Sequence, residues 1–214
     1  MSRATADKAL TLHWMPSLIK AQAIMDSGVR LAVRQESVLR GAGPACGEQC
    51  GGCCSSRRAE ATAVEMAGAL WSLKRDASEP AATALERFLA PPRLQDQGCP
   101  FLVEGACSAY SMRFLSCRQL VVFGRACSPG EDPTRSRRAD LLTPLRMHAY
   151  KAYSLLLPHL GVPVPPSDPL ELEAALKGCL NPAGDFSARV AASLLLTHGT
   201  EAAQASRQAP RQAA

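Results

Sequence analysis

In Cys46-Gly-Glu-Gln-Cys50-Gly-Gly-Cys53-Cys54, four cysteines stand within nine residues, with glycines between them. A soft divalent cation takes about four thiolate ligands, and thiolates repel one another unless a cation neutralises them. Glycines suit such a loop because they reach positive φ at no steric cost and leave amide N–H groups free to point at sulfur. The stretch therefore predicts a metal-binding loop.

The adjacent pair Cys53 and Cys54 cannot easily point the same way. Either the two thiols serve different sites, or one is a ligand and the other packs against the protein. Four further cysteines follow downstream, which brings the candidate ligands to eight. The predicted ligand set is Cys46, Cys50, Cys53, Cys54, Cys99, Cys107, Cys117 and Cys127.

Eight thiols fit two tetrahedral zinc sites, one four-iron cluster with a neighbouring zinc, or a single site with spare thiols. The ninth cysteine, Cys179, stands apart from the others. It is predicted to be a core residue because free cysteine is among the most buried residue types.

The same residues carry a resemblance to a known family. After the first cluster come Cys99-Pro-Phe-Leu102, Cys107-Ser-Ala-Tyr110, Arg113 and Cys117-Arg118. In this order, over roughly residues 46 to 127, they resemble the YkgJ-type cysteine-cluster family of zinc- or iron-chelating domains, also called the CxxCxxCC type. The resemblance implies a cysteine cluster that binds zinc or iron, with an iron–sulfur cluster as one form of the iron site.

The chain departs from that family's pattern at two places. Arg113-Phe114 stands where relatives usually have Arg-Pro, and the first cluster begins with a gap of three residues. These departures leave the choice of metal open. The resemblance also brings a distant enzymatic relative, the flagellin lysine N-methylases, which carry a similar cluster.

The composition favours a mainly α-helical protein. Of the 214 residues, 47% are hydrophobic and 5% aromatic, and alanine and leucine are abundant, which is a helix-favouring mixture. We expect helices that buttress an irregular, cysteine-rich metal-binding core. The predicted organisation is one α-helical domain over residues 1–199, with its cysteine core at 46–127, and a disordered tail at 200–214.

The charge and hydropathy patterns bear on which classes of partner the protein binds and on where in the cell it is expected. A net charge of +5 is mild and does not predict nucleic-acid binding. No apolar run approaches the ~20 residues needed to cross a bilayer, and residues 1–11 lack the apolar core of a signal peptide. We therefore expect a cytoplasmic protein, where reducing conditions favour metal binding over disulfides.

Apolar periodicity, caps and breakers predict six helices. Their expected ranges are 5–40 with a break near Pro16, 57–75, 80–90, 140–157, 168–177 and 185–197. The apolar repeat Ile24, Leu31 and Val38 is expected to face the core, and Leu85, Phe88 and Leu89 are expected to be buried. Residues 93–134 are expected to be irregular, with one short strand or helical turn, and ordered by metal ligands.

Other polar residues receive ordinary interpretations. His13, His148, His159 and His198 do not stand at ligand spacing from a cysteine pair and are expected to be ordinary partly buried or surface residues. Arg113 and Arg118 either offset the negative charge of the thiolates or pair with surface carboxylates such as Glu104 or Asp140. The basic run 135–138 is expected to be a solvated face.

Three functions remain open from the sequence. The first is metal binding itself, through the cysteine cluster. The second is an iron–sulfur enzyme related to the lysine N-methylases, which needs a pocket for a methyl donor and a lysine side chain; no catalytic residue is identified. The third is an adaptor, stabilised by zinc, that binds a protein partner through the apolar face of a helix containing Leu141.

Overall fold

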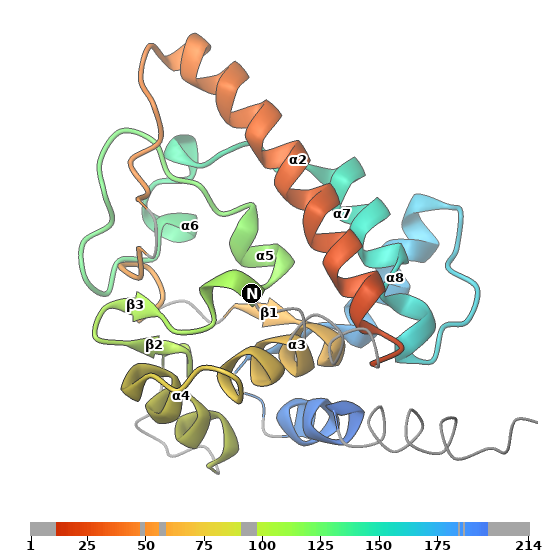
Figure 1. Ribbon diagram of the computed structural model, residues 1–214. Coiled ribbons are helices and arrows are strands. Elements are labelled where there is room, and N and C mark those ends of the chain that lie inside the picture. Colours follow the sequence, from red (N-terminus) through yellow and green to blue (C-terminus); the bar gives the residue numbers. More distant parts are fainter. Residues whose placement is uncertain are drawn as a thin grey trace, which may run out of the picture.

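The computed structural model describes residues 12–47, 50–55, 59–90, 98–183, 185 and 187–196, and these are mainly helical (Figure 1). The predicted helix-rich fold is therefore confirmed. The start of the first predicted helix, at 5–11, and the predicted tail at 200–214 lie outside the described residues.

The longest helix is α2, Met15–Arg40 (Figure 1). The predicted break near Pro16 is confirmed in the described residues, because residues 12–14 form a turn and α2 begins at Met15. The proline lies in the first turn of the helix, where its missing N–H costs no hydrogen bond. The helix ends where Gly41 adopts a φ of 64°, the left-handed conformation that favours glycine.

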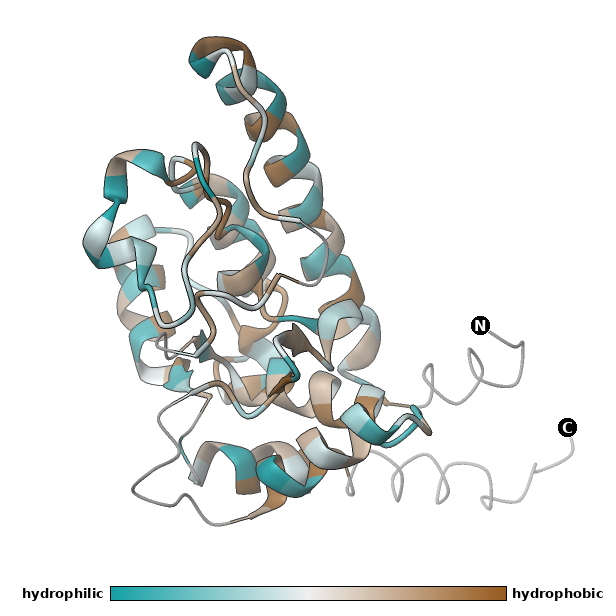
Figure 2. Ribbon diagram, turned by 90° about the vertical axis from the view of Figure 1, so that its left-hand side faces the viewer, coloured by the Kyte–Doolittle hydropathy of each residue, from teal (hydrophilic) through white to brown (hydrophobic). Residues whose placement is uncertain are grey.

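Only the first half of α2 packs against the core, through Leu18, Ala21 and Met25. Leu31 is 55% exposed and Val38 82% exposed, so the expected seven-residue apolar stripe does not face the core over its whole length. The helix extends beyond the rest of the molecule, and Figure 2 shows hydrophobic residues at its free end.

Two further helices, α3 and α4, contribute to the core on the other side from α2. Helix α3 is Ala63–Leu73 and begins later than predicted, because residues 60–61 form strand β1 and Thr62 caps the helix. Helix α4 is Glu79–Leu89 and begins at the predicted cap, Ser78. On α4 the side chain of Phe88 is fully buried as expected, Leu85 is partly buried, and Leu89 is 49% exposed, so its predicted burial is wrong.

The cysteine-bearing region from residue 98 onward has more regular structure than predicted. Strands β2, Leu102–Val103, and β3, Ala106–Cys107, form a hairpin, which is followed by the 3₁₀ helix η1, Tyr110–Met112, and helix α5, Leu115–Arg118. Glu104 and Gly105 make the turn of the hairpin with φ values of 51° and 80°. Further along are helix α6, Pro133–Ser136, and the 3₁₀ helix η2, Arg138–Asp140.

The predicted helix at 140–157 is wrong at its start. Helix α7 is Arg146–Ser154, and the residues before it are extended, with Leu142 buried and Leu141 bridged to Val122. Pro144 explains the difference, because a proline inside a helix removes one hydrogen bond and clashes with the preceding turn. The apolar residues at 141–145 therefore belong to an extended segment and do not form one face of a helix.

The remaining elements close the core. The 3₁₀ helix η3, Leu157–Leu160, leads to helix α8, Pro169–Cys179, which begins at the predicted cap Asp168 and continues through Gly178. Strand β4, Asn181–Pro182, pairs antiparallel with β1, and residues 187–196 are helical. None of the described helices combines the length and the hydropathy that crossing a bilayer requires.

Candidate metal centre

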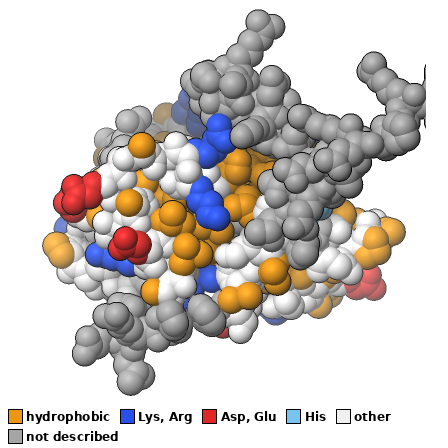
Figure 3. Space-filling view, turned by 60° about the horizontal axis from the view of Figure 1, so that its bottom comes forward, with side chains coloured by type: hydrophobic (Ala, Val, Ile, Leu, Met, Phe, Trp, Pro, Cys, Tyr) orange, Lys and Arg blue, Asp and Glu red, His pale blue; other side chains and the backbone are white. Residues whose placement is uncertain are grey.

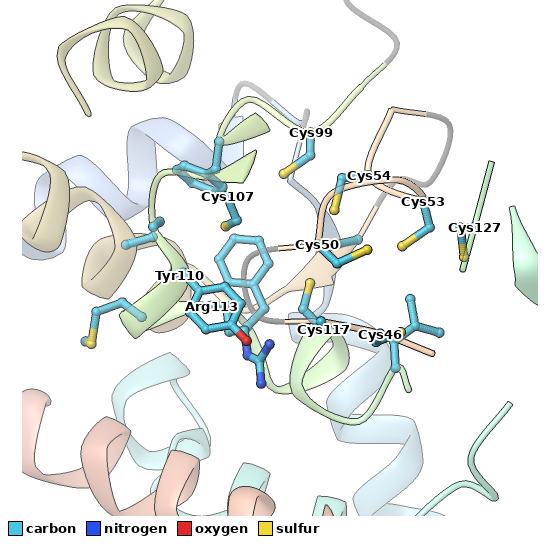
Figure 4. A pocket seen from close by; sticks show the side chains of 18 residues that line it. Cys46, Cys50, Cys53, Cys54, Cys99, Cys107, Tyr110, Arg113, Cys117 and Cys127 are labelled. Atoms are coloured by element: carbon cyan, nitrogen blue, oxygen red, sulfur yellow. The ribbon is translucent and has the colours of Figure 1, made fainter. Parts of the chain in front are cut away.

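All eight predicted ligands line one pocket. Its lining includes Cys46, Cys50, Cys53, Cys54, Cys99, Cys107, Cys117 and Cys127, together with apolar side chains such as Phe101 and Phe114 (Figure 4). The cavity has a volume of about 90 Å³. The fold therefore brings together thiols that are up to 81 residues apart in the sequence, since Cys46 and Cys127 both face it.

The first cysteine loop is attached to the segment that follows α5. The backbone of Pro44 bridges to Phe123, and the N–H of Ala45 donates to the carbonyl of Val122 at 2.7 Å. The N–H of Val122 in turn donates to Sγ of Cys46 at 3.2 Å. An amide that points at sulfur stabilises the thiolate, so this contact suits a metal ligand.

The rest of the loop is attached to the β2–β3 hairpin. The backbone of Cys50 forms a bridge with Ala106, and the N–H of Cys99 donates to the carbonyl of Cys54 at 3.1 Å. Gly51 lies so close to the hairpin that a Cβ at this position would approach the carbonyl oxygen of Gly105. Glycine is therefore required here by the close approach of two backbones.

Cys117 is positioned by a buried carboxylate that the sequence analysis missed. Glu65 in α3 is fully buried, and it accepts hydrogen bonds from the N–H of Leu115 at 2.7 Å and from the N–H and Oγ1 of Thr62, both at 2.8 Å. It thus holds the start of α5, the helix that carries Cys117. The Thr-Ala-Val-Glu capping box at 62–65 was the sequence signal that could have identified it.

Cys127 lies beside a network of charged side chains. Arg137 contacts Glu131 at 2.6 Å and Asp140 at 2.9 Å, and its guanidinium donates to Sγ of Cys127 at 3.7 Å. Arg125 also contacts Glu131, at 3.0 Å. The basic run at 135–138 was predicted to be a solvated face; Arg137 is instead largely buried at the edge of the cysteine pocket.

The two arginines near Cys117 have different roles. Arg113 lines the pocket with its guanidinium over the ring of Tyr110, and its charge lowers the pKa of both Cys46 and Cys107 against the larger effect of burial. Arg118 contacts Asp26 at 2.7 Å and donates to the carbonyl groups of Arg113 and Ser111. Arg113 thus fits the charge-offsetting role, whereas Arg118 fixes the local backbone.

Histidine does not join the thiols in the described residues. His148 packs against Gly28 of α2, and His159 lies near His13 and within 3.1 Å of Oγ of Ser17. His198 lies outside the described residues. Cys179 is half-buried against the core and not in the pocket lining, and all nine cysteines are free thiols, so the disulfide alternative receives no support.

The environment disfavours thiolate anions without a cation. Burial raises the pKa of Cys99 to about 12, and the neighbouring thiols of Cys117 and Cys107 add to the shift. Burial likewise raises the pKa of Cys127 to about 11, with further contributions from Cys53 and Cys46. Thiols that repel one another when charged are the donor set that a soft metal ion neutralises.

The thiols converge, but they do not form a finished coordination sphere. Among the described residues, no three side chains of histidine, cysteine, aspartate or glutamate are arranged so that they could hold an ion as they stand. The donor chemistry fits zinc or iron, whereas the positions require the sulfur atoms to move closer together. Such contraction on binding is expected where metal binding is coupled to folding.

Comparison with known proteins points to the same segment. Residues 45–131 match the model of a family described as "Putative zinc- or iron-chelating domain", CxxCxxCC. This segment is similar to the CxxCxxCC domains. The match spans all eight pocket cysteines and agrees with the resemblance seen in the sequence. No curated protein and no solved structure gave a significant match.

Proposed function

We propose that this chain binds zinc or iron through the pocket thiols of its CxxCxxCC-like segment. One observation carries the proposal: a single small pocket is lined by eight cysteines from two separate segments of the chain. Cysteine-rich sites of this kind hold Zn²⁺ or iron–sulfur clusters, because both prefer soft sulfur ligands.

The bound metal would have a structural role. It would tie the loop at 44–54 to the hairpin and helix at 98–127, which are otherwise attached by a small number of backbone hydrogen bonds. Sites with four cysteine ligands leave no open position for a substrate. The apparent binding free energy of such sites in small zinc domains, about 10–16 kcal/mol, is large compared with the stability of a typical domain.

The methylase alternative has less support. The cavity of about 90 Å³ is smaller than the ~300–1,000 Å³ of pockets that enclose drug-sized ligands. A methyl donor and a lysine side chain would both need space beside the metal. The pocket fits metal ions better than it fits an organic cofactor with its substrate.

The adaptor alternative loses the surface predicted for it, since Leu141 is not in a helix. Other apolar side chains are exposed. The face in Figure 3 carries a group of hydrophobic side chains next to Lys and Arg, and Leu89 and Val190 are exposed on the elements at this end of the molecule. These features do not indicate the chemistry of a partner.

The proposal is tested by elemental analysis and a visible spectrum of protein purified without oxygen. Zinc in a colourless protein, or iron with acid-labile sulfide in a brown one, supports metal binding and identifies the metal. The variant Cys50→Ser/Cys53→Ser is expected to lose metal, whereas Cys179→Ser, which alters a half-buried thiol outside the pocket, is expected to retain it. Wild-type protein with reduced thiols but without metal would contradict the proposal.

A further inference from the structure

Resting on the proposed function, we propose that the eight thiols form two separate four-thiolate sites. Cys46, Cys50, Cys53 and Cys127 hold one metal ion, and Cys54, Cys99, Cys107 and Cys117 hold the other. In Figure 4 the side chains of the first set lie toward Cys127 and those of the second set lie toward Cys99 and Cys107. We refer to them as the outer set, which contains Cys127, and the hairpin set, which contains Cys107.

The adjacent pair Cys53 and Cys54 marks the division. The N–H of Cys54 donates to the carbonyl of Gly51 at 2.9 Å, which closes a tight turn at this point. In Figure 4 Cys53 lies on the side nearer Cys127, with its sulfur directed toward Cys50, whereas Cys54 lies between Cys50 and Cys99. The backbone contact between Cys54 and Cys99, at 3.1 Å, agrees with that arrangement. One short loop therefore supplies ligands in two directions.

The outer set is assembled by contacts between the first loop and the segment after α5. Gly52 packs so closely against Cys127 that a Cβ on this glycine would lie 3.2 Å from Cβ of Cys127. The N–H of Val122, in the same segment, donates to Sγ of Cys46 at 3.2 Å. In Figure 4 the side chains of Cys50 and Cys53 lie next to each other on this side of the pocket.

The hairpin set is assembled by β2, β3 and α5. In the hairpin Cys107 pairs with Leu102, whose N–H donates to the carbonyl of Cys99 at 3.1 Å. Cys117 comes from α5 and lines the same pocket as Cys99 and Cys107. These three cysteines and Cys54 surround one part of the pocket in Figure 4.

The two sets meet where the backbone of Cys50 forms a bridge with Ala106 of β3, so Cys50 lies next to both sets. Cys50 is therefore the ligand whose assignment depends most on side-chain direction, and in Figure 4 its sulfur points toward Cys53. Arg113 acts on both sets, because its charge favours the thiolates of Cys46 and Cys107. A divalent ion with four thiolates carries a net charge of about −2, which a shared arginine partly offsets.

Eight thiolates exceed the four that a single zinc ion accepts. The division therefore predicts two metal equivalents per chain. The competing arrangement is a single polynuclear cluster in which bridging thiolates belong to both metals. The two arrangements differ in whether the loss of one set of ligands leaves the other metal bound.

The test is a titration of the reduced, metal-free full chain with Co²⁺, read by thiolate-to-cobalt charge transfer. Wild-type protein is expected to bind two equivalents, while Cys46→Ser/Cys127→Ser and Cys99→Ser/Cys107→Ser each bind one. Cys179→Ser is the control and retains two. Loss of both metals in either double variant, or a single equivalent in the wild type, overturns the division. If wild-type protein binds no metal, the proposed function itself fails.

A measurement on wild-type protein covers the case in which a double variant does not fold. With two equivalents of Cd²⁺ bound, cadmium NMR is expected to show two signals in the region of four-sulfur coordination, without coupling between them. Coupling between the two cadmium ions would require a bridging sulfur and would overturn the proposal of separate sites.

Discussion

Glu65 shows how one buried side chain supports the thiol pocket from outside it. Its carboxylate accepts three hydrogen bonds, which connect the cap of α3 to the start of α5. Burial raises the pKa of this carboxyl, an effect that the hydrogen bonds from Thr62 and Leu115 oppose. The residue is therefore stable in this position only because its oxygen atoms have these partners.

We predict that Glu65→Ala lowers the free energy of unfolding by roughly 2–4 kcal/mol, since buried donors lose their acceptor. Urea unfolding followed by circular dichroism measures the change. Glu60→Ala, at an exposed side chain in β1, is the control and is expected to change stability by less than about 0.5 kcal/mol. Equal effects for both substitutions would contradict the role given to Glu65.

Glu131 gives a prediction about pH. Its hydrogen bonds from Arg137 and from the N–H of Ser128 lower the pKa of this carboxyl to about 2. A lowered folded-state pKa means that the unfolded chain binds the proton more readily. The contribution of Glu131 to stability is therefore complete above the ordinary value of ~4.3 and is lost as the pH falls toward about 2.

In Arg137→Ala the pKa of Glu131 is expected to rise toward its ordinary value, as measured by NMR titration of side-chain carboxyl groups. The acid-unfolding curve should shift to higher pH in the same variant. Arg135→Ala, which alters an exposed neighbour that contacts Asp132, should leave both quantities unchanged. A Glu131 titration that is the same in wild type and Arg137→Ala would exclude the role of this contact.

At the scale of elements, α2 and α8 each contain a glycine inside the helix. The space around each glycine decides whether replacing it by alanine raises or lowers stability. Within a helix, Gly→Ala normally stabilises by up to about 1 kcal/mol. Gly178 in α8 has open space around it, whereas a Cβ on Gly28 of α2 would lie 2.6 Å from the ring of His148 in α7. The two substitutions are therefore expected to have opposite signs.

We predict that Gly178→Ala raises the free energy of unfolding by about 0.5–1 kcal/mol. Gly28→Ala should lower it by about 1–3 kcal/mol, because α2 and α7 must move apart. Thermal unfolding under identical metal load measures both. A stabilising Gly28→Ala would mean that α7 does not pack on α2 in this way.

The element scale also shows where sequence periodicity fails. The apolar residues at 141–145 match a helical face by spacing, but Pro144 prevents a helix there and the segment pairs with Val122 instead. Strand β1 replaces the predicted start of α3, because it pairs with β4, about 120 residues away in the chain. Such pairing cannot be read from a local pattern.

At the scale of the whole molecule, two parts are held together in different ways: a helical part by its apolar core, and the cysteine-bearing segments by short backbone pairings. Helices α2, α3 and α4 contribute the fully buried side chains of Leu18, Leu70 and Phe88. The cysteine-bearing segments hold their positions through short strands and isolated backbone bridges. Metal binding is therefore expected to affect the two parts differently.

We predict that removal of the metal with a chelator lowers the melting temperature and increases amide hydrogen exchange at 44–54 and 98–131. Protection in α3 is expected to remain higher, since its side chains form the apolar core. A ligand present at 1,000 times its dissociation constant stabilises the folded state by about 4 kcal/mol. Unchanged exchange in the cysteine segments would contradict a structural role for the metal.

Local patterns in the sequence predicted the helix-rich fold, the caps at Ser78 and Asp168, and the resemblance of residues 45–131 to a cysteine-cluster family. These follow from local chemistry, because caps, prolines and ligand spacings act over a few residues. Only the tertiary structure placed Cys46 and Cys127 in one pocket and Arg137 against the thiol of Cys127. The physical reason is that both placements depend on backbone pairing between distant segments, and a linear pattern does not record which distant segments meet.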